Sequence, residues 1–327
     1  MTQTGKVLIL GISGQDGSYL AKILSVLGYS VYGTSRNPSQ ASIDINFQAI
    51  QLNKKISILA LNPEDSEAVY HIINELQPNY IFNMSGQTSV GKSFKDEHAT
   101  YQSIVPVVEN ILNAIVEINP SIRFLNAGSG EMFDASSDQD ITEDSEIKPL
   151  SPYAEAKFIA FNMIKNFRNK KKIFAATAIL FNHESILRPD YFVTKKIITS
   201  AYQILNGQLE YMEIGDISIE RDWGWAPEYA DAMVRLITLD DPQDCIIASG
   251  QTISLKYFIE SVFSELNLNY HNHIKINSSF FRPNEAMRIA ANPNKITKLT
   301  AWKSSIRGRK LGKKLISEYL LLKQEKR

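Results

Sequence analysis

Tyr153 and Lys157 are the two side chains in this sequence whose spacing most directly suggests acid–base chemistry. Four residues apart on a helix, a phenol and an ammonium share one face. An ammonium nearby favours the phenolate, so we expect the pKa of Tyr153 to fall from its usual value of about 10 towards the range of a general base. An ordinary surface pair has the same spacing, so the hypothesis depends on the surrounding elements.

A hydroxyl and a carboxylate precede this pair, at Ser129 and Glu131. Both follow a predicted strand at 123–127, and ligands bind at the carboxyl ends of parallel strands. Ser129 would donate a hydrogen bond to a reacting oxygen. Glu131 is more informative. Alcohol oxidation needs no carboxylate, but a carboxylate is needed to remove a proton beside a ketone and to protonate a leaving hydroxyl. The alternative for Glu131 is a solvated loop acid.

A glycine-rich segment, Gly-Ile-Ser-Gly-Gln-Asp-Gly at 11–17, lies between the apolar run 7–10 and an amphipathic helix pattern at 18–27. In this context the glycines allow a tight turn and a close approach to a pyrophosphate, which the N–H groups of the helix N-terminus then bind. The alternative is a tight turn without a ligand. We predict a dinucleotide site formed by Gly11, Ser13, Gly14, Gln15, Asp16 and Gly17.

The end of the second predicted strand, at 29–34, distinguishes the two common dinucleotides. A site that prefers NAD carries an acid there to bind the ribose hydroxyls. The segment 32–37 has no acid, and Arg36 offers a planar cation suited to a 2′-phosphate. We therefore expect NADP rather than NAD. The alternative is that Arg36 is a solvated loop residue.

The first half of the chain alternates β-rich runs with helical patterns, which is typical of parallel βαβ units. We predict an α/β fold, a Rossmann-type doubly wound parallel sheet with a smaller α/β substrate-binding domain. The Rossmann domain is expected at 1–180, with segments near 219–248 returning to it, and the smaller domain takes the rest of 181–327. Further strands are expected at 56–61, 80–84 and 174–181, and long helices near 97–118 and 151–168.

The bulk composition argues against several classes of protein. Lys+Arg and Asp+Glu balance at 35 each, which does not suggest a nucleic-acid or membrane surface. The chain has no apolar run of about 20 residues and no signal-peptide core near its start, so we expect a cytoplasmic protein. The single cysteine, Cys245, is expected to be a small buried hydrophobe. The five histidines suggest no metal site.

Seven segments of this sequence resemble the extended short-chain dehydrogenase/reductase superfamily and, within it, the GDP-mannose 4,6-dehydratase family. The resemblance covers nearly the whole chain. The later segments that carry it are the more specific, because the family uses them to recognise substrate. The segments are 11–20, 129–133, 151–157, 180–185, 192–197, 221–224 and 281–285.

The resemblance implies a nucleotide-sugar 4,6-dehydratase that converts a GDP-hexose, such as GDP-mannose, to a 4-keto-6-deoxy sugar without net oxidation. Tyr153 would take the proton of the C4 hydroxyl while hydride passes from C4 to NADP, and Lys157 would steady the phenolate. Glu131 would remove the C5 proton and assist loss of the C6 hydroxyl as water. The same hydride would return to C6. Ser129 stands where the family has threonine and keeps the hydroxyl.

The resemblance also implies which residues hold the ligands. The cofactor would contact Tyr153, Lys157, Asn62 and His183 in addition to the glycine-rich segment and Arg36. The long helices would pair between subunits, giving a homodimer or homotetramer. Trp223 is expected to pack in the core rather than to stack on a base. The implied substrate-binding residues are Asn182, Lys196, Arg221, Arg282 and Glu285, and the alternative for each arginine is a surface ion pair.

Other functions remain as alternatives. Departures from the family pattern around both ligands leave the sugar open, with another GDP-sugar, such as a heptose, as the alternative to GDP-mannose. A related NADP-dependent nucleotide-sugar reductase or epimerase would share Ser129, Tyr153 and Lys157 but would not need Glu131. A cofactor-binding protein without catalysis would be expected to lack the tyrosine or the lysine.

Overall fold

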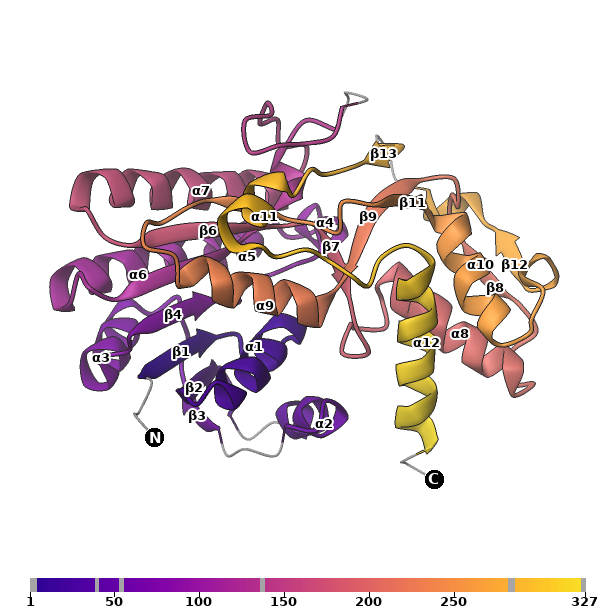
Figure 1. Cartoon of the computed structure of the whole chain (residues 1–327), viewed down its shortest axis with the longest axis horizontal. Coiled ribbons are helices and arrows are strands. Elements are labelled where there is room, and N and C mark those ends of the chain that lie inside the picture. The colour runs from indigo at the N-terminus through magenta and orange to yellow at the C-terminus, as the bar shows by residue number, and fades with distance from the viewer. Residues whose placement is uncertain (1–4, 39–40, 53–55, 136–138, 282–285, 325–327) are drawn as a thin grey trace.

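A parallel sheet of seven strands lies at the centre of the larger part of the molecule in the computed structural model, which describes residues 5–38, 41–52, 56–135, 139–281 and 286–324 (Figure 1). The strand order is β10-β6-β5-β4-β1-β2-β3. The order reverses between β1 and β4, which is where such sheets bind ligands. The predicted doubly wound sheet is therefore confirmed. Its strands are β1 (Lys6–Leu10), β2 (Ser30–Ser35), β3 (Ser57–Ala60), β4 (Tyr80–Asn83), β5 (Arg123–Ser129), β6 (Ala175–Leu180) and β10 (Cys245–Ile247).

Helices cover both faces of this sheet. Val7 and Ile9 of β1 pack with α1 (Gln15–Val26) and α9 (Ala226–Ile237), whereas Leu8 and Leu10 pack with the helices of the opposite face. Burial on both faces explains why the strand is apolar throughout rather than alternating. The helices of the second face are α3 (Ser66–Leu76), α6 (Val105–Ile118) and α7 (Pro152–Lys171), and α2 (Ala41–Ala49) follows β2.

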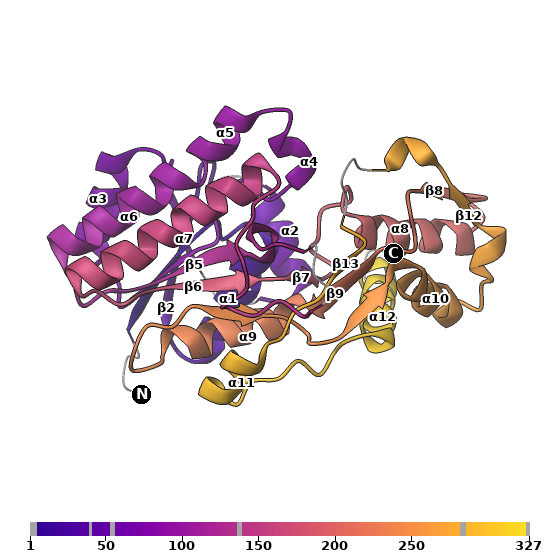
Figure 2. The same ribbon diagram turned by 90° about the horizontal axis from the view of Figure 1, so that it is seen from above.

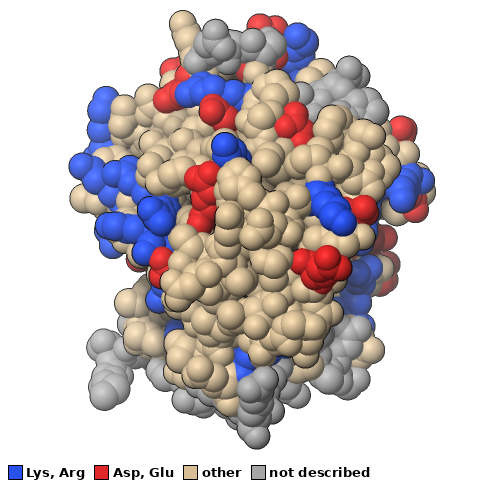
Figure 3. Space-filling model, turned by 90° about the vertical axis from the view of Figure 1, so that its right-hand side faces the viewer, with Lys and Arg blue, Asp and Glu red and all other residues tan. Residues whose placement is uncertain are grey.

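A smaller α/β part lies beside the sheet (Figure 2). Its core surrounds Trp223, which is buried as predicted. Figure 3 shows the side of this part, where basic and acidic side chains surround a broad area without charged residues. Its elements are α8 (Val193–Leu205), β8 (Met212–Ile214), α10 (Leu255–Glu265), β12 (Ile274–Ile276) and α12 (Arg309–Gln324). A four-stranded sheet consists of β7 (Asn182–Glu184), β9 (Glu220–Trp225), β11 (Thr252–Ser254) and β13 (Arg288–Ile289).

Three elements beyond residue 181 pack with the larger part. Helix α9 packs against α1, and β10 pairs in parallel with β6, while α11 (Asn294–Thr300) packs against both α9 and β10. Strand β9 lies in the same stretch of sequence but pairs with β7, β11 and β13 instead. Cys245 begins β10 and is buried, as expected.

Some element boundaries differ from the sequence-based expectation. The helix expected from residue 18 begins at Gln15, directly after the extended N-cap Gly14. The continuous helix expected near 97–118 is instead α5 (Glu97–Gln102) followed by α6, which has a proline in its first turn, where the missing N–H costs no hydrogen bond. Within the described ranges, no helix combines the length and apolar character of a membrane span, and no cluster of three metal-ligating side chains occurs.

Candidate active site

A cavity of about 630 Å³ lies where the carboxyl ends of the central strands meet the smaller part of the molecule. The four predicted catalytic residues all line it, although the sequence separates the first from the last by 28 positions. Three predicted substrate-binding residues line the same cavity. The fold therefore brings these two predicted sets together. The catalytic set is Ser129, Glu131, Tyr153 and Lys157, and the substrate-binding set is Asn182, Lys196 and Arg221.

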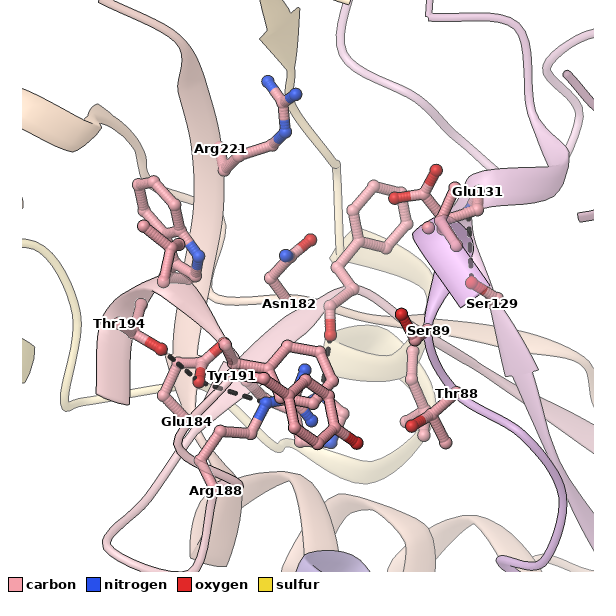
Figure 4. Close-up of a pocket in the computed structure, with 18 of the residues that line it drawn as sticks. Thr88, Ser89, Ser129, Glu131, Asn182, Glu184, Arg188, Tyr191, Thr194 and Arg221 are labelled. Carbon is pink, nitrogen blue, oxygen red and sulfur yellow. Dashed lines mark hydrogen bonds and ion pairs between the residues drawn. The ribbon is translucent and has the colours of Figure 1, made fainter. Parts of the chain in front are cut away.

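Two short structural devices position the catalytic side chains. The Ser129 hydroxyl, at the end of β5, accepts a hydrogen bond of 3.2 Å from the Glu131 N–H and begins the turn Gly130–Met132, as Figure 4 shows. At Gly130 an added Cβ would lie 2.7 Å from the Phe181 ring, so a larger residue here would force that ring to shift. Ser151 caps α7 by accepting from the Ala154 N–H at 3.1 Å, which places Tyr153 in the first helical turn.

The electrostatics of Tyr153 differ from the sequence-based expectation. Burial raises the pKa of Tyr153 to about 12, and its hydrogen bond with Ser129 offsets this only in part. The Lys157 ammonium donates to the Ala127 carbonyl oxygen at 2.7 Å and lies 5.8 Å from the tyrosine ring centroid. Burial also lowers the pKa of Lys157 to about 8. The expected lowering of the tyrosine pKa is therefore wrong for this structure, because desolvation of the phenol outweighs the Ser129 hydrogen bond and the Arg188 charge that lower it.

The glycine-rich segment forms a cradle before α1. Gly11 has a φ of 77°, and an added Cβ there would lie 2.7 Å from the Met84 carbonyl oxygen. A Cβ on Gly17 would lie 2.4 Å from the Gly11 carbonyl oxygen. Both positions therefore require glycine, and Gly14 leaves the helix N-terminus open. This arrangement of backbone N–H groups fits a pyrophosphate. Ser13 contributes a carbonyl that accepts from the Asn46 amide at 2.8 Å.

The side chains of Gln15 and Asp16 connect this cradle to β7. Gln15 donates to the His183 carbonyl oxygen at 3.1 Å and accepts from the Ser185 hydroxyl at 2.8 Å. The His183 Nε2 lies 2.9 Å from an Asp16 carboxylate oxygen, and Nδ1 lies 2.6 Å from the Phe181 carbonyl oxygen. Since neither acceptor carries a proton, both ring nitrogens donate and the imidazole is charged.

The charge of His183 gives a pH-dependent prediction. Burial opposes the charged ring, but the Asp16 carboxylate outweighs it and raises the pKa of His183 above 6.5. The pair therefore stabilises the fold fully below pH 6.5, and this contribution is lost as the pH rises through the raised pKa. An NMR titration of the His183 ring should show a higher midpoint in the wild type than in Asp16→Asn. Equal midpoints would contradict this pairing.

Arg36 and Asn62, which are also predicted to contact the cofactor, lie outside the cavity. Arg36 is exposed directly after β2, and Asn62 is exposed after β3. The Asn62 side chain accepts from the Glu64 N–H at 3.5 Å. Both residues follow strands on the β2 side of the cradle, so a dinucleotide that begins in the cavity and crosses the cradle would end near them.

The predicted substrate-binding residues form the facing wall. Arg221 is 7% exposed, so it is buried in the cavity wall, and it donates to the Glu220 carbonyl oxygen at 2.8 Å. Lys196 donates to the Glu213 carbonyl oxygen at 2.6 Å. Figure 4 shows Asn182 between this wall and the segment that carries Ser129 and Glu131. The predicted Arg282 and Glu285 lie outside the described residues.

Sequence reasoning missed an ion pair in the cavity wall. The Glu184 carboxylate is buried, accepts from the Thr194 hydroxyl at 2.6 Å and lies 3.3 Å from the Arg188 Nε (Figure 4). The two charged residues are four positions apart, but Glu184 ends β7 and Arg188 lies in the bend that follows, so the helical rule for this spacing does not apply. Only the fold shows that they line the site.

The doubly wound sheet, the cradle and the tyrosine–lysine–hydroxyl set define an enzyme of the extended short-chain dehydrogenase/reductase class. A sequence model described as GDP-mannose 4,6 dehydratase matches residues 8–315. The chain is 34% identical to the human GDP-mannose 4,6 dehydratase over 328 residues, covering 91% of this chain and 87% of that protein. It is 31% identical to GDP-mannose 4,6 dehydratase 1 of Arabidopsis thaliana, covering 98% and 91%.

This chain belongs to the GDP-mannose 4,6-dehydratase family. The predicted family is thereby confirmed, and so is the predicted enzyme class, a nucleotide-sugar 4,6-dehydratase and hydro-lyase.

Solved structures agree on the fold. RMD from Pseudomonas aeruginosa, solved with NADPH, superposes with a TM-score of 0.78 at 20% identity, covering 97% of this chain and 99% of that one. The dTDP-glucose 4,6-dehydratase of Bacillus anthracis, solved with NAD, gives 0.83 at 16% identity, covering 98% and 97%. Family and fold together support the predicted nicotinamide cofactor, and the two neighbours differ in its form.

Proposed function

We propose that this protein is an NADP-dependent dehydratase that converts GDP-mannose, or a closely related GDP-hexose, to the 4-keto-6-deoxy sugar. One observation carries the proposal. The Glu131 carboxylate lines the same cavity as Tyr153, Lys157 and Ser129. A reductase or an epimerase of this class has no use for a carboxylate there, whereas elimination of water next to a ketone requires one.

The cofactor site joins the cavity to the glycine cradle. In this proposal the cradle residues hold the pyrophosphate, Asn62 contacts the adenine, and Tyr153, Lys157 and His183 surround the nicotinamide end. When bound, the nicotinamide supplies a hydride acceptor and a positive charge. That charge matters for Tyr153, because burial raises the pKa of its phenol to about 12 and a phenolate needs positive charge nearby.

The catalytic residues then act as acids and bases in sequence. Tyr153 accepts the proton of the C4 hydroxyl, Ser129 donates a hydrogen bond to the same oxygen, and Lys157 stabilises the phenolate. Glu131 removes the C5 proton, which the C4 ketone makes acidic, and passes a proton to the leaving C6 hydroxyl. The hydride taken from C4 ends at C6, so the reaction is redox-neutral.

The opposite wall binds the nucleotide diphosphate. Asn182 offers an amide, and Lys196 and Arg221 offer cations that suit phosphate oxygens. We keep Arg282 and Glu285 in this set on the strength of the sequence resemblance. The position of Arg221 in the cavity wall supports its role, since a planar guanidinium there suits phosphate oxygens.

Arg36 supports NADP over NAD. Replacing it with alanine should weaken NADP binding about tenfold, since a charge-assisted hydrogen bond to the 2′-phosphate would be lost. NAD has no such phosphate, so its affinity should change little. Equilibrium titration of both cofactors with both proteins measures the difference. Equal losses for the two cofactors would show that Arg36 does not read the phosphate.

We also propose a domain organisation and a subunit assembly for this protein. Residues 1–180 and segments near 219–248 make up the cofactor domain, and the rest of 181–327 makes up the smaller nucleotide-sugar domain. Helices α5, α6 and α7 would pair between subunits of a homodimer or homotetramer in the cytoplasm. Light scattering of the purified protein measures the assembly.

The sugar and the nucleotide are tested with a substrate panel. The purified protein is incubated with GDP-mannose, other GDP-hexoses, a GDP-heptose, and CDP- and UDP-sugars, and products are analysed by mass spectrometry. The expected result is loss of one water from a GDP-hexose without accumulation of reduced nicotinamide. Dehydration of only the CDP- or UDP-sugars, or reduction without water loss, would reject the proposal.

A further inference from the structure

A row of two aromatic rings with a cationic side chain at each end crosses the rim of the cavity. The Arg188 guanidinium lies 3.6 Å from the Phe192 ring centroid, and the Phe192 and Tyr191 rings are 4.7 Å apart. The Lys92 ammonium lies 4.5 Å from the Tyr191 centroid. These four residues, the cation–aromatic row, connect the segment after β7 to the short helix α4 (Val90–Ser93), which follows β4.

The two ends of the row are held differently. At the inner end, Arg188 pairs with Glu184, whose carboxylate is 2% exposed and accepts the Thr194 hydroxyl. At the outer end, Tyr191 is 59% exposed, and Lys92 is also exposed. A cation–π contact between exposed groups is weak, whereas a buried ion pair is costly to break, because either charge would be left unpaired. The inner end is therefore fixed, and the outer contact opens easily.

The row lies between two walls of the catalytic cavity. In Figure 4, Thr88 and Ser89 lie on the side of Ser129 and Glu131, and Tyr191 and Arg188 lie across from them. Residues 88–91 line the cavity directly before Lys92, and Tyr191 lines it from the other wall. Contact between Lys92 and Tyr191 therefore bridges the cavity at its rim.

We propose that Tyr191 and Lys92 form a gate that retains the sugar in the cavity until the reaction is complete. This inference rests on the proposed dehydratase function. The contact opens to admit the nucleotide sugar and closes beside it, while Arg188 and Glu184 hold the base of the gate. Loop contacts of this kind commonly sequester an intermediate from water.

The proposed reaction has an intermediate that must not escape. Oxidation at C4 moves a hydride, with its two electrons, to the nicotinamide and a proton to Tyr153. Loss of the C5 proton and the C6 hydroxyl as water then leaves a 4-keto-5,6-unsaturated sugar. If this sugar leaves, its hydride stays behind, so each lost molecule leaves one reduced nicotinamide on the enzyme. A gate that stays closed until the hydride has returned keeps the number of lost sugar molecules small.

The test uses the full protein with its bound cofactor and GDP-mannose. The fraction of turnovers that release the unsaturated ketone is measured by mass spectrometry, together with reduced nicotinamide by absorbance. Tyr191→Ala removes the ring and both contacts, and should raise this fraction about tenfold. Lys92→Met removes only the cation and should raise it about threefold. Tyr191→Phe keeps the ring and should behave like the wild type. Tyr257→Ala, at an exposed tyrosine of α10, is the matched control.

A second measurement separates the gate from the chemistry. In a Tyr153→Phe background, which is expected to bind the substrate without reacting, the dissociation rate of GDP-mannose should also rise about tenfold on Tyr191→Ala. Unchanged release and an unchanged dissociation rate in Tyr191→Ala would overturn the gate. If the wild type binds GDP-mannose but never dehydrates it, the proposed function fails, and the dissociation rates still decide whether the gate exists.

Discussion

Glu131→Gln is expected to lower the rate of 4-keto-6-deoxy sugar formation about a thousandfold, the usual contribution of a positioned general acid–base group. The amide keeps the size of the side chain but neither accepts the C5 proton nor donates one to the leaving hydroxyl. Because Tyr153, Lys157 and Ser129 remain, oxidation at C4 should still occur. The variant should therefore accumulate reduced nicotinamide and a 4-keto sugar that retains its C6 hydroxyl, which mass spectrometry detects.

Glu155→Gln is the matched control for this variant. Glu155 is an exposed carboxylate two residues beyond Tyr153 on α7, so its loss should leave the rate near that of the wild type. Full dehydration by Glu131→Gln would show that the carboxylate is a solvated acid with no chemical role. Loss of both dehydration and C4 oxidation would point to general damage to the site.

Tyr153→Phe is expected to stop the reaction at its first step, with a loss of about a thousandfold or more in product formation. Phenylalanine fills the same space in the cavity wall but accepts no proton from the C4 hydroxyl. This variant should form neither product nor reduced nicotinamide, which distinguishes it from Glu131→Gln. Stopped-flow absorbance after mixing with GDP-mannose measures the first step directly.

Two control measurements accompany this prediction. Binding of GDP-mannose to Tyr153→Phe, measured by calorimetry, should match the wild type within a few-fold, because the phenol acts in proton transfer rather than in nucleotide recognition. Tyr257→Phe should be indistinguishable from the wild type, since that tyrosine is exposed on α10 away from the cavity. Reduced nicotinamide appearing at the normal rate in Tyr153→Phe would assign the base to another group.

The sequence predicts the parts of this fold that local patterns encode. Val7 to Leu10 is apolar at every position because β1 is buried on both faces, and Gly11 and Gly17 of the cradle stand where a Cβ would clash. The pair Tyr153 and Lys157 is equally local, since one helix sets its geometry. The convergence of Glu131 with this pair follows from strand order, which a parallel sheet makes predictable.

What the sequence does not predict depends on burial and on contacts between distant segments. The raised pKa of Tyr153 comes from desolvation, which the spacing to Lys157 does not reveal. The pair of Asp16 and His183 joins residues 167 positions apart, and only the fold brings them within hydrogen-bond distance. The buried ion pair of Glu184 with Arg188 joins the end of β7 to the bend after it, and no periodicity of the sequence encodes the shape of that bend.

The central claim is that one cavity first removes a hydride at C4 and then returns it at C6. Its most direct test is GDP-mannose carrying deuterium at C4, with the product examined by NMR and mass spectrometry. The expected product is a 4-keto-6-deoxy sugar with the deuterium on C6 and none in the solvent. Deuterium that remains at C4, or that is found only on released reduced nicotinamide, would contradict it.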